Sequence, residues 1–391
     1  MKKILFLPFL QMRSGHHQVA EALMDMVQTQ TQGIFVKKVD LMSYASPMME
    51  KLITSSYLNW INYAPSTYDL VYKKLFFSPS RSVQHSQKWY FFYFYKKLEQ
   101  LLMEEKPDLI VCTHGFPSYL LSQLKSRGKC NTPVVNAYTD FFINKVWGRE
   151  EIEYHFLPHK DNKEEFSKKV QIQGQRLVVT GIPVHQDITK NTSIKKSLNR
   201  PKILMSGGNN GLGGIAQLLG ESRHDSRCDF YVLCGKNSRL FNQISSWQSE
   251  HIHPLPYISS REEMNHLYDE MDAIVTKPGG VTISEALQKR LPIFVHSVLP
   301  GQEEINLQYL LEKGLVFQLN EKDLSEVELL SFLQNKELMS NWERSIQSFE
   351  NSIELADSEE IVGFLREILD IDSISPARKR IDSKVYHLAR A

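Results

Sequence analysis

The chain has 391 residues, of which 42% are hydrophobic and 23% charged, and its formal net charge is +1 at pH 7. The composition is that of a folded protein and excludes a disordered chain, and the length favours two domains. A net charge so close to zero supplies no large positive field, which excludes a general nucleic-acid binder.

Strands and helices are predicted to alternate in the first half of the chain. A helix is predicted over residues 16–28, where apolar side chains recur at helical spacing. The expected strands are apolar runs at residues 2–9, 35–41, 107–114, 133–140, 154–158 and 176–184. The first run is short and has no cleavage site after it, so we interpret it as a buried strand and not as a signal peptide.

The same alternation restarts after a polar, charged segment. Further strands are expected at residues 202–208, 228–235, 251–258, 272–277, 292–297 and 315–319. Strand–helix alternation predicts α/β domains with parallel, doubly wound, Rossmann-like sheets. The predicted organisation is an N-terminal domain (1–185), a linker (186–200), a C-terminal domain (201–355), a closing helix (356–372) and a basic tail (373–391).

The four cysteines form no CxxC pair and no zinc-binding spacing, which is typical of reduced thiols in a cytoplasmic protein. No stretch approaches the ~20 apolar residues of a membrane-spanning helix. The one DxD sequence, at residues 370–372, falls at the end of the last predicted helix and is interpreted as a solvated helix terminus. We therefore predict neither a metal site nor a cofactor.

Three turns of the second domain carry glycines or amides where a strand ends. The first holds Ser206, Gly207, Gly208 and Asn209, the second Lys277, Gly279 and Gly280, and the third the segment 299–306. In open α/β sheets ligands bind at this edge, and glycine turns followed by helices suit phosphate. Neither GxGxxG nor GxxxxGK[ST] is present, which disfavours dinucleotide and P-loop binding. The alternative for each turn is a tight turn without a ligand.

Glu285 lies about one turn into the helix that follows the second glycine turn. A carboxylate there can accept hydrogen bonds from two ribose hydroxyls, and the alternative is a favourable charge near a helix N-terminus. Together the turns and this carboxylate predict a site for a diphosphate that carries a sugar and a nucleoside.

The sequences TKPGGVTISEALQKRLPIFV and PGQEEINLQYLLEKGLV resemble a known donor site. They are similar to the diacylglycerol glucosyltransferase and monogalactosyldiacylglycerol synthase family (glycosyltransferase family 28), and more distantly to the N-acetylglucosaminyltransferase of peptidoglycan synthesis. The resemblance covers roughly residues 2–370 and includes LMSGGNNG, YVLCGKN, VTGIPV, PVVNAYTDF and SGHHQVAEAL. It implies a GT-B fold with the active site between the two domains.

The resemblance also implies roles for single residues. It places Glu285 on the ribose, and it places the backbone of Tyr257 and Ile258 on the uracil. The other implied donor-site residues are Ser206, Gly207, Gly208, Asn209, Lys277, Gly279, Gly280 and Thr282 towards the diphosphate, and Gln302, Glu303 and Asn306 on the hexose. His16 is the implied general base or acceptor-positioning group, with Asp140 as its companion.

Simpler interpretations of these side chains stay open. His16 could cap its helix, Asp140 could cap the segment after its strand, and Lys277 could be an ordinary surface lysine. We expect the neighbouring His17 to be solvated.

A run of aromatic residues between lysines, KWYFFYFYKK at residues 88–97, is the other unusual feature. It suits a membrane interface, where aromatic rings lie at headgroup level and lysines meet anionic lipid. The predicted membrane and acceptor surface comprises Trp89, Tyr90, Phe91, Phe92, Lys96 and Lys97. The alternative is a core helix that contributes aromatic side chains to the first domain.

The sequence thus predicts a cytoplasmic, peripherally membrane-associated, inverting glycosyltransferase. Its partners would be a UDP-sugar, with glucose favoured, a lipid acceptor such as diacylglycerol, and an anionic membrane surface. The alternatives are another lipid or small-molecule acceptor, a UDP-N-acetylglucosamine 2-epimerase-like enzyme, and a UDP-sugar-binding regulator. The regulator is suggested by Arg13-Ser14-Gly15-His16, which keeps one glycine of the family's GxGH, and by Asn144, where the family often has histidine.

Overall fold

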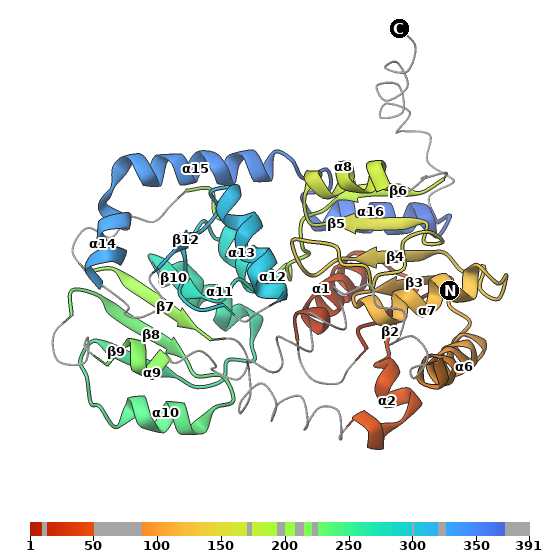
Figure 1. The fold of residues 1–391 in the computed structure, drawn as a ribbon, viewed down its shortest axis with the longest axis horizontal. Helices are drawn as coiled ribbons and strands as arrows, with labels where there is room; N and C mark the ends of the chain where they lie inside the picture. Colours follow the sequence, from red (N-terminus) through yellow and green to blue (C-terminus); the bar gives the residue numbers. More distant parts are fainter. Residues whose placement is uncertain are drawn as a thin grey trace, which may run out of the picture.

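The protein forms two lobes, each built on a parallel sheet with helices packed around it (Figure 1). This computed structural model describes residues 1–9, 14–50, 88–169, 174–193, 200–207, 215–220, 226–298, 301–319 and 326–371. The predicted fold class, two doubly wound Rossmann-like α/β domains in tandem, is confirmed. The predicted basic tail lies outside the described residues.

Within the residues that the structure describes, each sheet has six strands, and every neighbouring pair is parallel. In spatial order the first sheet consists of β2 (Ile34–Lys38), β1 (Lys2–Leu7), β3 (Leu109–Cys112), β4 (Val134–Ala137), β5 (Tyr154–Leu157) and β6 (Arg176–Val179). The second consists of β12 (Phe317–Gln318), β11 (Ile293–Val295), β10 (Ala273–Thr276), β7 (Lys202–Ser206), β8 (Asp229–Leu233) and β9 (Ile252–Leu255).

The helices connect these strands and cover the sheets. Those of the first half are α1 (Gly15–Gln30), α2 (Leu41–Ala45), α6 (Lys88–Glu105), α7 (Gly115–Lys125) and α8 (Lys160–Lys169). Those of the second half are α9 (Ile215–Leu218), α10 (Ser238–Ser245), α11 (Arg261–Glu270), α12 (Gly280–Gln288), α13 (Gln302–Glu312), α14 (Glu326–Gln334), α15 (Lys336–Glu350) and α16 (Ser358–Ile368). Within the described ranges, none of them is long and apolar enough to cross a membrane.

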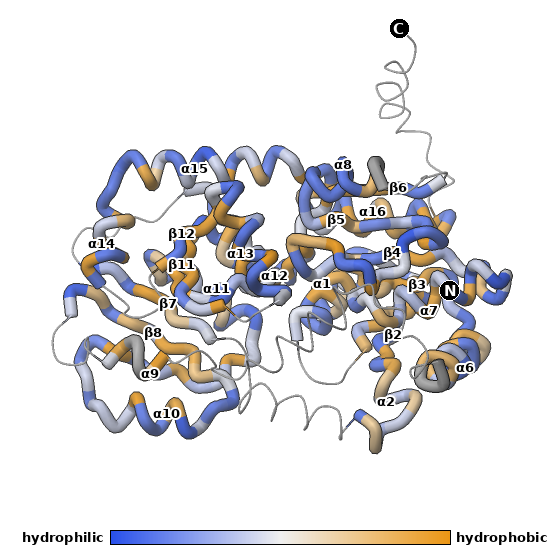
Figure 2. Tube along the Cα trace, in the orientation of Figure 1, coloured by the Kyte–Doolittle hydropathy of each residue, from blue (hydrophilic) through white to orange (hydrophobic). Residues whose placement is uncertain are grey.

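The hydrophobic core follows the strands, which are mostly orange in Figure 2, whereas outer helices such as α15 carry many hydrophilic residues. Ile4, Leu5, Phe6 and Leu7 of β1 are all fully buried. A strand covered by helices on both faces buries consecutive side chains, and for this reason its sequence is a continuous apolar run and not an alternating one.

The last helix returns to the first lobe, a packing that the sequence did not predict. The Phe364 ring of α16 lies edge-on to Tyr154 of β5, with 5.9 Å between centroids, and 5.7 Å from Phe156. Helix α16 also packs against α1, so the chain crosses between the lobes after β6 and again after α15 (Figure 1). Two crossings tie the lobes together at one side.

Helix α13 of the second lobe touches the first lobe through a stripe at helical spacing, Asn306, Tyr309 and Lys313. The Tyr309 ring stacks on the buried His159 ring with 3.9 Å between centroids. The Lys313 ammonium pairs with the Asp161 carboxylate at 2.5 Å. Asn306 hydrogen-bonds to the turn after β4. One face of α13 is therefore part of the interdomain contact.

The backbones of the two lobes approach each other closely at Gly280, the first residue of α12. A Cβ atom there would lie 2.0 Å from the carbonyl oxygen of Thr139 and 2.8 Å from Ile182 Cδ1. A Cβ atom at the neighbouring Gly279 would meet nothing within 4 Å. The missing side chain of Gly280 thus allows contact with the other domain, whereas Gly279 faces open space.

We predict that Gly280→Ala disrupts this contact and that Gly279→Ala does not. Overpacking at a rigid backbone contact costs about 1–3 kcal/mol, so Gly280→Ala should lower the thermal midpoint or increase the radius of gyration measured by small-angle X-ray scattering. Gly279→Ala is the matched control and should resemble the wild type in both measurements. Equal behaviour of the two variants would contradict the assignment.

Candidate active site

The turns at the carboxyl ends of the two sheets meet between the lobes. Thr139 and Asp140 follow β4 of the first sheet, and Pro278 and Gly280 follow β10 of the second. The contact of Gly280 with Thr139 and the hydrogen bond from Asn306 Nδ2 to the Pro278 carbonyl oxygen (3.1 Å) bring these turns together. This edge of an open α/β sheet is where ligands bind, so we place the candidate site here.

His16, in the first turn of α1, is held by the ends of two neighbouring strands. Its Nδ1 lies 2.8 Å from the Thr113 carbonyl oxygen and 2.9 Å from Thr139 Oγ1. A carbonyl oxygen can only accept, so Nδ1 carries the proton and Nε2 keeps its lone pair. The simpler interpretation, a helix cap, does not describe these contacts, because the N-cap residue is Ser14.

Burial lowers the pKa of His16 to about 4, against the opposing hydrogen bond with Thr113, and the neighbouring His17 adds to the lowering. His16 is therefore neutral at pH 7, with Nε2 able to accept a proton. His17 itself is not solvated as expected. His17 is buried, and its Nε2 lies 2.8 Å from Asp40 Oδ1.

Asp140 is bonded to the second domain. Its Oδ1 accepts a hydrogen bond from Asn306 Nδ2 at 3.1 Å. Burial raises the pKa of Asp140 to about 6, and the bond from Asn306 opposes that shift. His16 forms its hydrogen bonds with Thr113 and Thr139. The role of Asp140 in assisting His16 therefore remains a prediction.

Asn306 joins both domains through its side-chain amide. Its Oδ1 accepts from the Phe141 N–H at 2.8 Å, and its Nδ2 donates to Asp140 and to Pro278. The sequence predicted a hexose contact for Asn306, whereas here its amide is buried and engaged in interdomain hydrogen bonds. No sequence signal distinguishes these two uses, because both need an amide at the first turns of α13.

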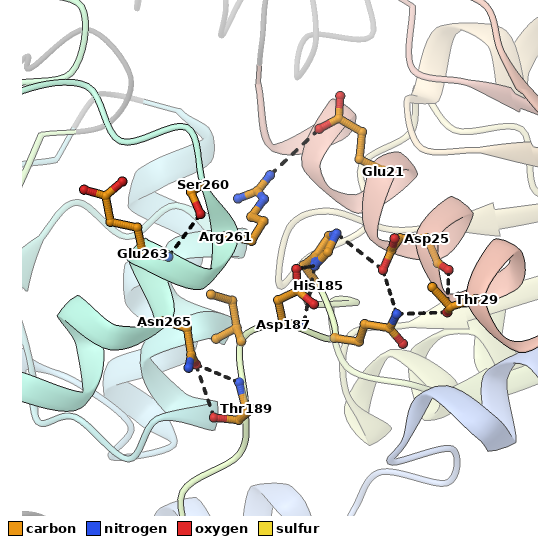
Figure 3. A network of polar contacts seen from close by, with 12 residues as sticks. Glu21, Asp25, Thr29, His185, Asp187, Thr189, Ser260, Arg261, Glu263 and Asn265 are labelled. Carbon is orange, nitrogen blue, oxygen red and sulfur yellow. Dashed lines mark hydrogen bonds and ion pairs between the residues drawn. The ribbon is translucent and has the colours of Figure 1, made fainter.

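Glu285, the predicted ribose ligand, is buried in α12. Its Oε2 accepts from the Tyr268 hydroxyl at 2.9 Å, and its Oε1 lies 3.8 Å from Arg261 NH1. Burial raises the pKa of Glu285, opposed first by Arg261 and then by the Tyr268 hydrogen bond. Arg261 also lies 3.8 Å from Glu21 of α1, which Figure 3 shows reaching across from the other domain. The sequence analysis missed both Tyr268 and Arg261.

Lys277 follows β10 and His296 follows β11, and both side chains are largely buried. Burial lowers the pKa of Lys277, and the Glu303 carboxylate opposes that shift. Burial also lowers the pKa of His296 to about 4, and Lys277 adds to the lowering. Among the described residues, His296 Nδ1 and Ser297 Oγ are buried without a hydrogen-bond partner. The sequence placed both residues inside the strand predicted at 292–297, whereas β11 ends at Val295 and leaves them at the edge of the sheet.

The remaining predicted donor residues are distributed along the same sheet. Ser206 ends β7 and Gly207 follows it, while Gly208 and Asn209 lie outside the described residues. Tyr257 follows β9, and the Lys236 ammonium lies 5.4 Å from its ring centroid. Three further residues are partly buried, Ile258 beside Tyr257, Thr282 in α12 and Gln302 at the start of α13.

The aromatic run lies on α6 and divides between core and surface. Phe94 and Tyr95 are buried, as the core-helix interpretation expects, whereas Phe92 is 61% exposed. Phe91 packs on α7, with its ring centroid 5.6 Å from that of Tyr119. The two lysines make local contacts, Lys96 with Glu99 and Lys97 with Gln100. The side chains of Trp89 and Tyr90 lie outside the described residues.

A polar network joins α1 of the first domain to the segment that follows β6 and to α11 of the second domain (Figure 3). His185 lies between two carboxylates, with Nε2 3.6 Å from Asp25 and Nδ1 3.5 Å from Asp187. One potential ligand atom from each of the three lies within 4.8 Å of the others. Gln186 also donates to Asp25 at 2.8 Å, so hydrogen bonds and ion pairs account for this group as a link between α1 and the interdomain segment.

Solved structures of similar fold are glycosyltransferases and sugar-nucleotide epimerases. The calicheamicin glycosyltransferase CalG4 superposes with a TM-score of 0.60 at 12% identity, covering 95% of this chain and 99% of that one. MurG of Acinetobacter baumannii gives 0.57 at 14%, covering 94% and 100%. The UDP-GlcNAc 2-epimerase of Neisseria meningitidis gives 0.54 at 15%, covering 93% and 100%. The fold is therefore GT-B.

Sequence relatives narrow the class to glycosyltransferases. The chain is 39% identical to the uncharacterized glycosyltransferase YkoN of Bacillus subtilis, over 89% of this chain and 93% of that protein. It is 30% identical to a processive diacylglycerol beta-glucosyltransferase of Staphylococcus saprophyticus, over 77% of each. The family model for monogalactosyldiacylglycerol synthase matches residues 16–184. The chain belongs to this family of glycosyltransferases, as the sequence resemblance indicated.

We predict that Asn306→Ala weakens the interdomain contact. It leaves the Phe141 N–H and the Pro278 carbonyl unpaired, which costs about 1–3 kcal/mol of unfolding free energy. Gln308→Ala, at an exposed position of the same helix, is the control and should stay within about 0.5 kcal/mol of the wild type. Urea unfolding monitored by tryptophan fluorescence measures both, and equal midpoints for the two variants would refute the prediction.

Proposed function

We propose that the protein is an inverting glycosyltransferase that moves a hexose, with glucose favoured, from UDP to a lipid hydroxyl, with diacylglycerol as the first acceptor to test. The observation that carries the proposal is the neutral His16, whose Nδ1 is fixed by the Thr113 carbonyl where the turns of the two domains meet. The diacylglycerol beta-glucosyltransferases among the relatives support the choice of donor and acceptor.

In the proposed reaction, His16 Nε2 takes the proton of the acceptor hydroxyl. The hydroxyl oxygen attacks the anomeric carbon as the bond from that carbon to the diphosphate oxygen breaks, and UDP leaves with the electron pair. A single in-line displacement inverts the anomeric configuration. His16 becomes positively charged in this step and later releases its proton to solvent.

The low pKa of His16 makes donor binding part of the mechanism. A base with a pKa of about 4 is a weak acceptor at pH 7, because general bases work best when their pKa is near the working pH. A diphosphate bound between the domains would favour the charged imidazolium and raise that pKa. The carboxylate of Asp140, on the adjacent turn, would act in the same direction when ionised.

The donor would lie against the second domain. The open face at Gly279, the N-terminal end of α12 and the Lys277 ammonium can stabilise the diphosphate. Glu285 would bind the ribose, exchanging part of its contact with Arg261 for ribose hydroxyls. The remaining assignments follow the sequence prediction, with Ser206, Gly207, Gly208, Asn209 and Thr282 near the diphosphate, Tyr257 and Ile258 at the base, and Gln302, Glu303 and Asn306 near the hexose.

The acceptor would come from a membrane surface beside α6 and α7. Phe92 and Met103 of α6 are 61% and 64% exposed, and Tyr119 of α7 is 37% exposed. Exposed aromatic and apolar side chains beside lysines suit the lipid headgroup region, which supports a peripheral association with the inner face of the cell membrane.

The proposal predicts transfer of radiolabelled glucose from UDP-glucose to diacylglycerol in anionic vesicles. His16→Ala should lower kcat by about 10²–10⁴-fold, the usual contribution of a general base, while UDP still binds. Glu285→Gln should weaken UDP binding instead. UDP-glucose binding without labelled lipid would refute diacylglycerol as acceptor, and release of a free 2-epimer from UDP-N-acetylglucosamine would replace the proposal with an epimerase.

Membrane association predicts a specific role for Phe92. Phe92→Ser should weaken binding to anionic vesicles by about 10–150-fold, which corresponds to the ~1.5–3 kcal/mol gained by burying such a side chain. Val327→Ser on α14 is the matched control, because Val327 is 64% exposed but belongs to the second domain. Vesicle cosedimentation measures both, and equal losses would exclude α6 as the membrane-binding helix.

A further inference from the structure

His114, a residue to which the sequence analysis gave no role, follows β3 and caps α7. Its Nδ1 accepts a hydrogen bond from the Phe116 N–H at 3.0 Å. Only an unprotonated ring nitrogen can accept, so Nδ1 is bare and the proton of the neutral ring is on Nε2. Burial lowers the pKa of His114 well below its usual value, and the nearby His16 and His17 add to the lowering, which keeps the ring neutral.

The His114 ring lies edge-on to the His16 ring, with 4.6 Å between centroids and 73° between planes. The backbone gives the two rings opposite tautomers, because His16 donates from Nδ1 to Thr113 whereas His114 accepts at Nδ1 from Phe116. One ring therefore offers a lone pair at Nε2, and the other offers an N–H at Nε2. In the part of the chain that the structure describes, neither Nε2 has a hydrogen-bond partner.

Capping does not explain why this residue is histidine. Serine, aspartate or asparagine caps a helix equally well, and phenylalanine would fill the space beside Phe9, whose ring centroid lies 4.8 Å away. The His114 ring is half-buried, so its Nε2–H is accessible to solvent and to a ligand. An accessible donor directly beside the proposed base points to a contact with the acceptor.

We propose that His114 donates a hydrogen bond from Nε2 to a second oxygen of the acceptor, next to the hydroxyl that His16 deprotonates. This inference rests on the proposed transferase function. With ring centroids 4.6 Å apart, the two rings can present a proton acceptor and a proton donor to neighbouring oxygens of one acceptor. Such a pair selects acceptors in which an ester, ether or hydroxyl oxygen lies on the carbon beside the reacting one. A simple long-chain alcohol offers only the hydroxyl.

Two substitutions distinguish the role of His114 as the cap of α7 from its proposed role as a hydrogen-bond donor to the acceptor. His114→Asn keeps an oxygen near the position of Nδ1, so it can still cap α7, but its amide is too short to reach the position of Nε2. His114→Gln places an amide N–H near the position of Nε2. Unchanged thermal midpoints would show that neither substitution disturbs α7.

The test compares dioleoylglycerol with oleyl alcohol as acceptors in the same vesicles, with UDP-glucose as donor. Loss of one neutral hydrogen bond is worth about 0.5–1.5 kcal/mol, so His114→Asn should lower kcat/KM for dioleoylglycerol by about 3–10-fold. The value for oleyl alcohol should not change, and His114→Gln should recover most of the preference for dioleoylglycerol.

The outcomes distinguish this inference from the proposed function. If the wild-type protein glucosylates neither lipid, the proposed function fails, and the acceptor contact fails with it. If it glucosylates dioleoylglycerol and His114→Asn lowers both acceptors equally, His114 is a structural cap and the inference alone is overturned. Selective loss with recovery by His114→Gln supports both.

Discussion

The arrangement of the candidate site depends on the hydrogen bonds of one buried amide, that of Asn306. Asn306 accepts from the Phe141 N–H and donates to Asp140 and to the Pro278 carbonyl oxygen, so the turn after β4 and the turn after β10 are held by one side chain. The absent side chain of Gly280 allows the backbone approach that this arrangement needs. These contacts hold the turn that carries Asp140 of the first domain against the turn that carries Lys277 of the second, as the proposed reaction requires.

Backbone groups, and not carboxylates, fix the tautomers of His16 and His114 in the first domain. Thr113 fixes the proton of His16 on Nδ1, and the Phe116 N–H fixes the proton of His114 on Nε2, so two neighbouring rings at one sheet edge differ in hydrogen-bonding character. Burial keeps both neutral. A bound diphosphate would change this balance, and for this reason proton transfer in the proposed reaction requires the donor to be present.

The sequence predicted what depends on local pattern. Continuous apolar runs such as residues 2–9 identified buried parallel strands, and the glycine turns followed by helices lie at the end of the second sheet where the sequence expects a ligand. It could not predict contacts between residues far apart in the chain. The return of α16 to the first domain and the bonds of Asn306 depend on how two complete domains meet. The close approach of Gly280 to Thr139 could not be predicted either, because approach to another backbone and approach to an anion both require glycine.

The central claim is that the two domains together set the ionisation of the site, and the pH dependence of kcat/KM for glucose transfer tests it directly. We expect an acidic limb near pH 6 in the wild type, because the raised pKa of Asp140 is about 6 and activity falls as that carboxylate becomes protonated. Removing the hydrogen bond that lowers this pKa should move the limb of Asn306→Ala to higher pH, and Asp140→Asn should abolish it. A limb that stays at the same pH in all three proteins would contradict the account.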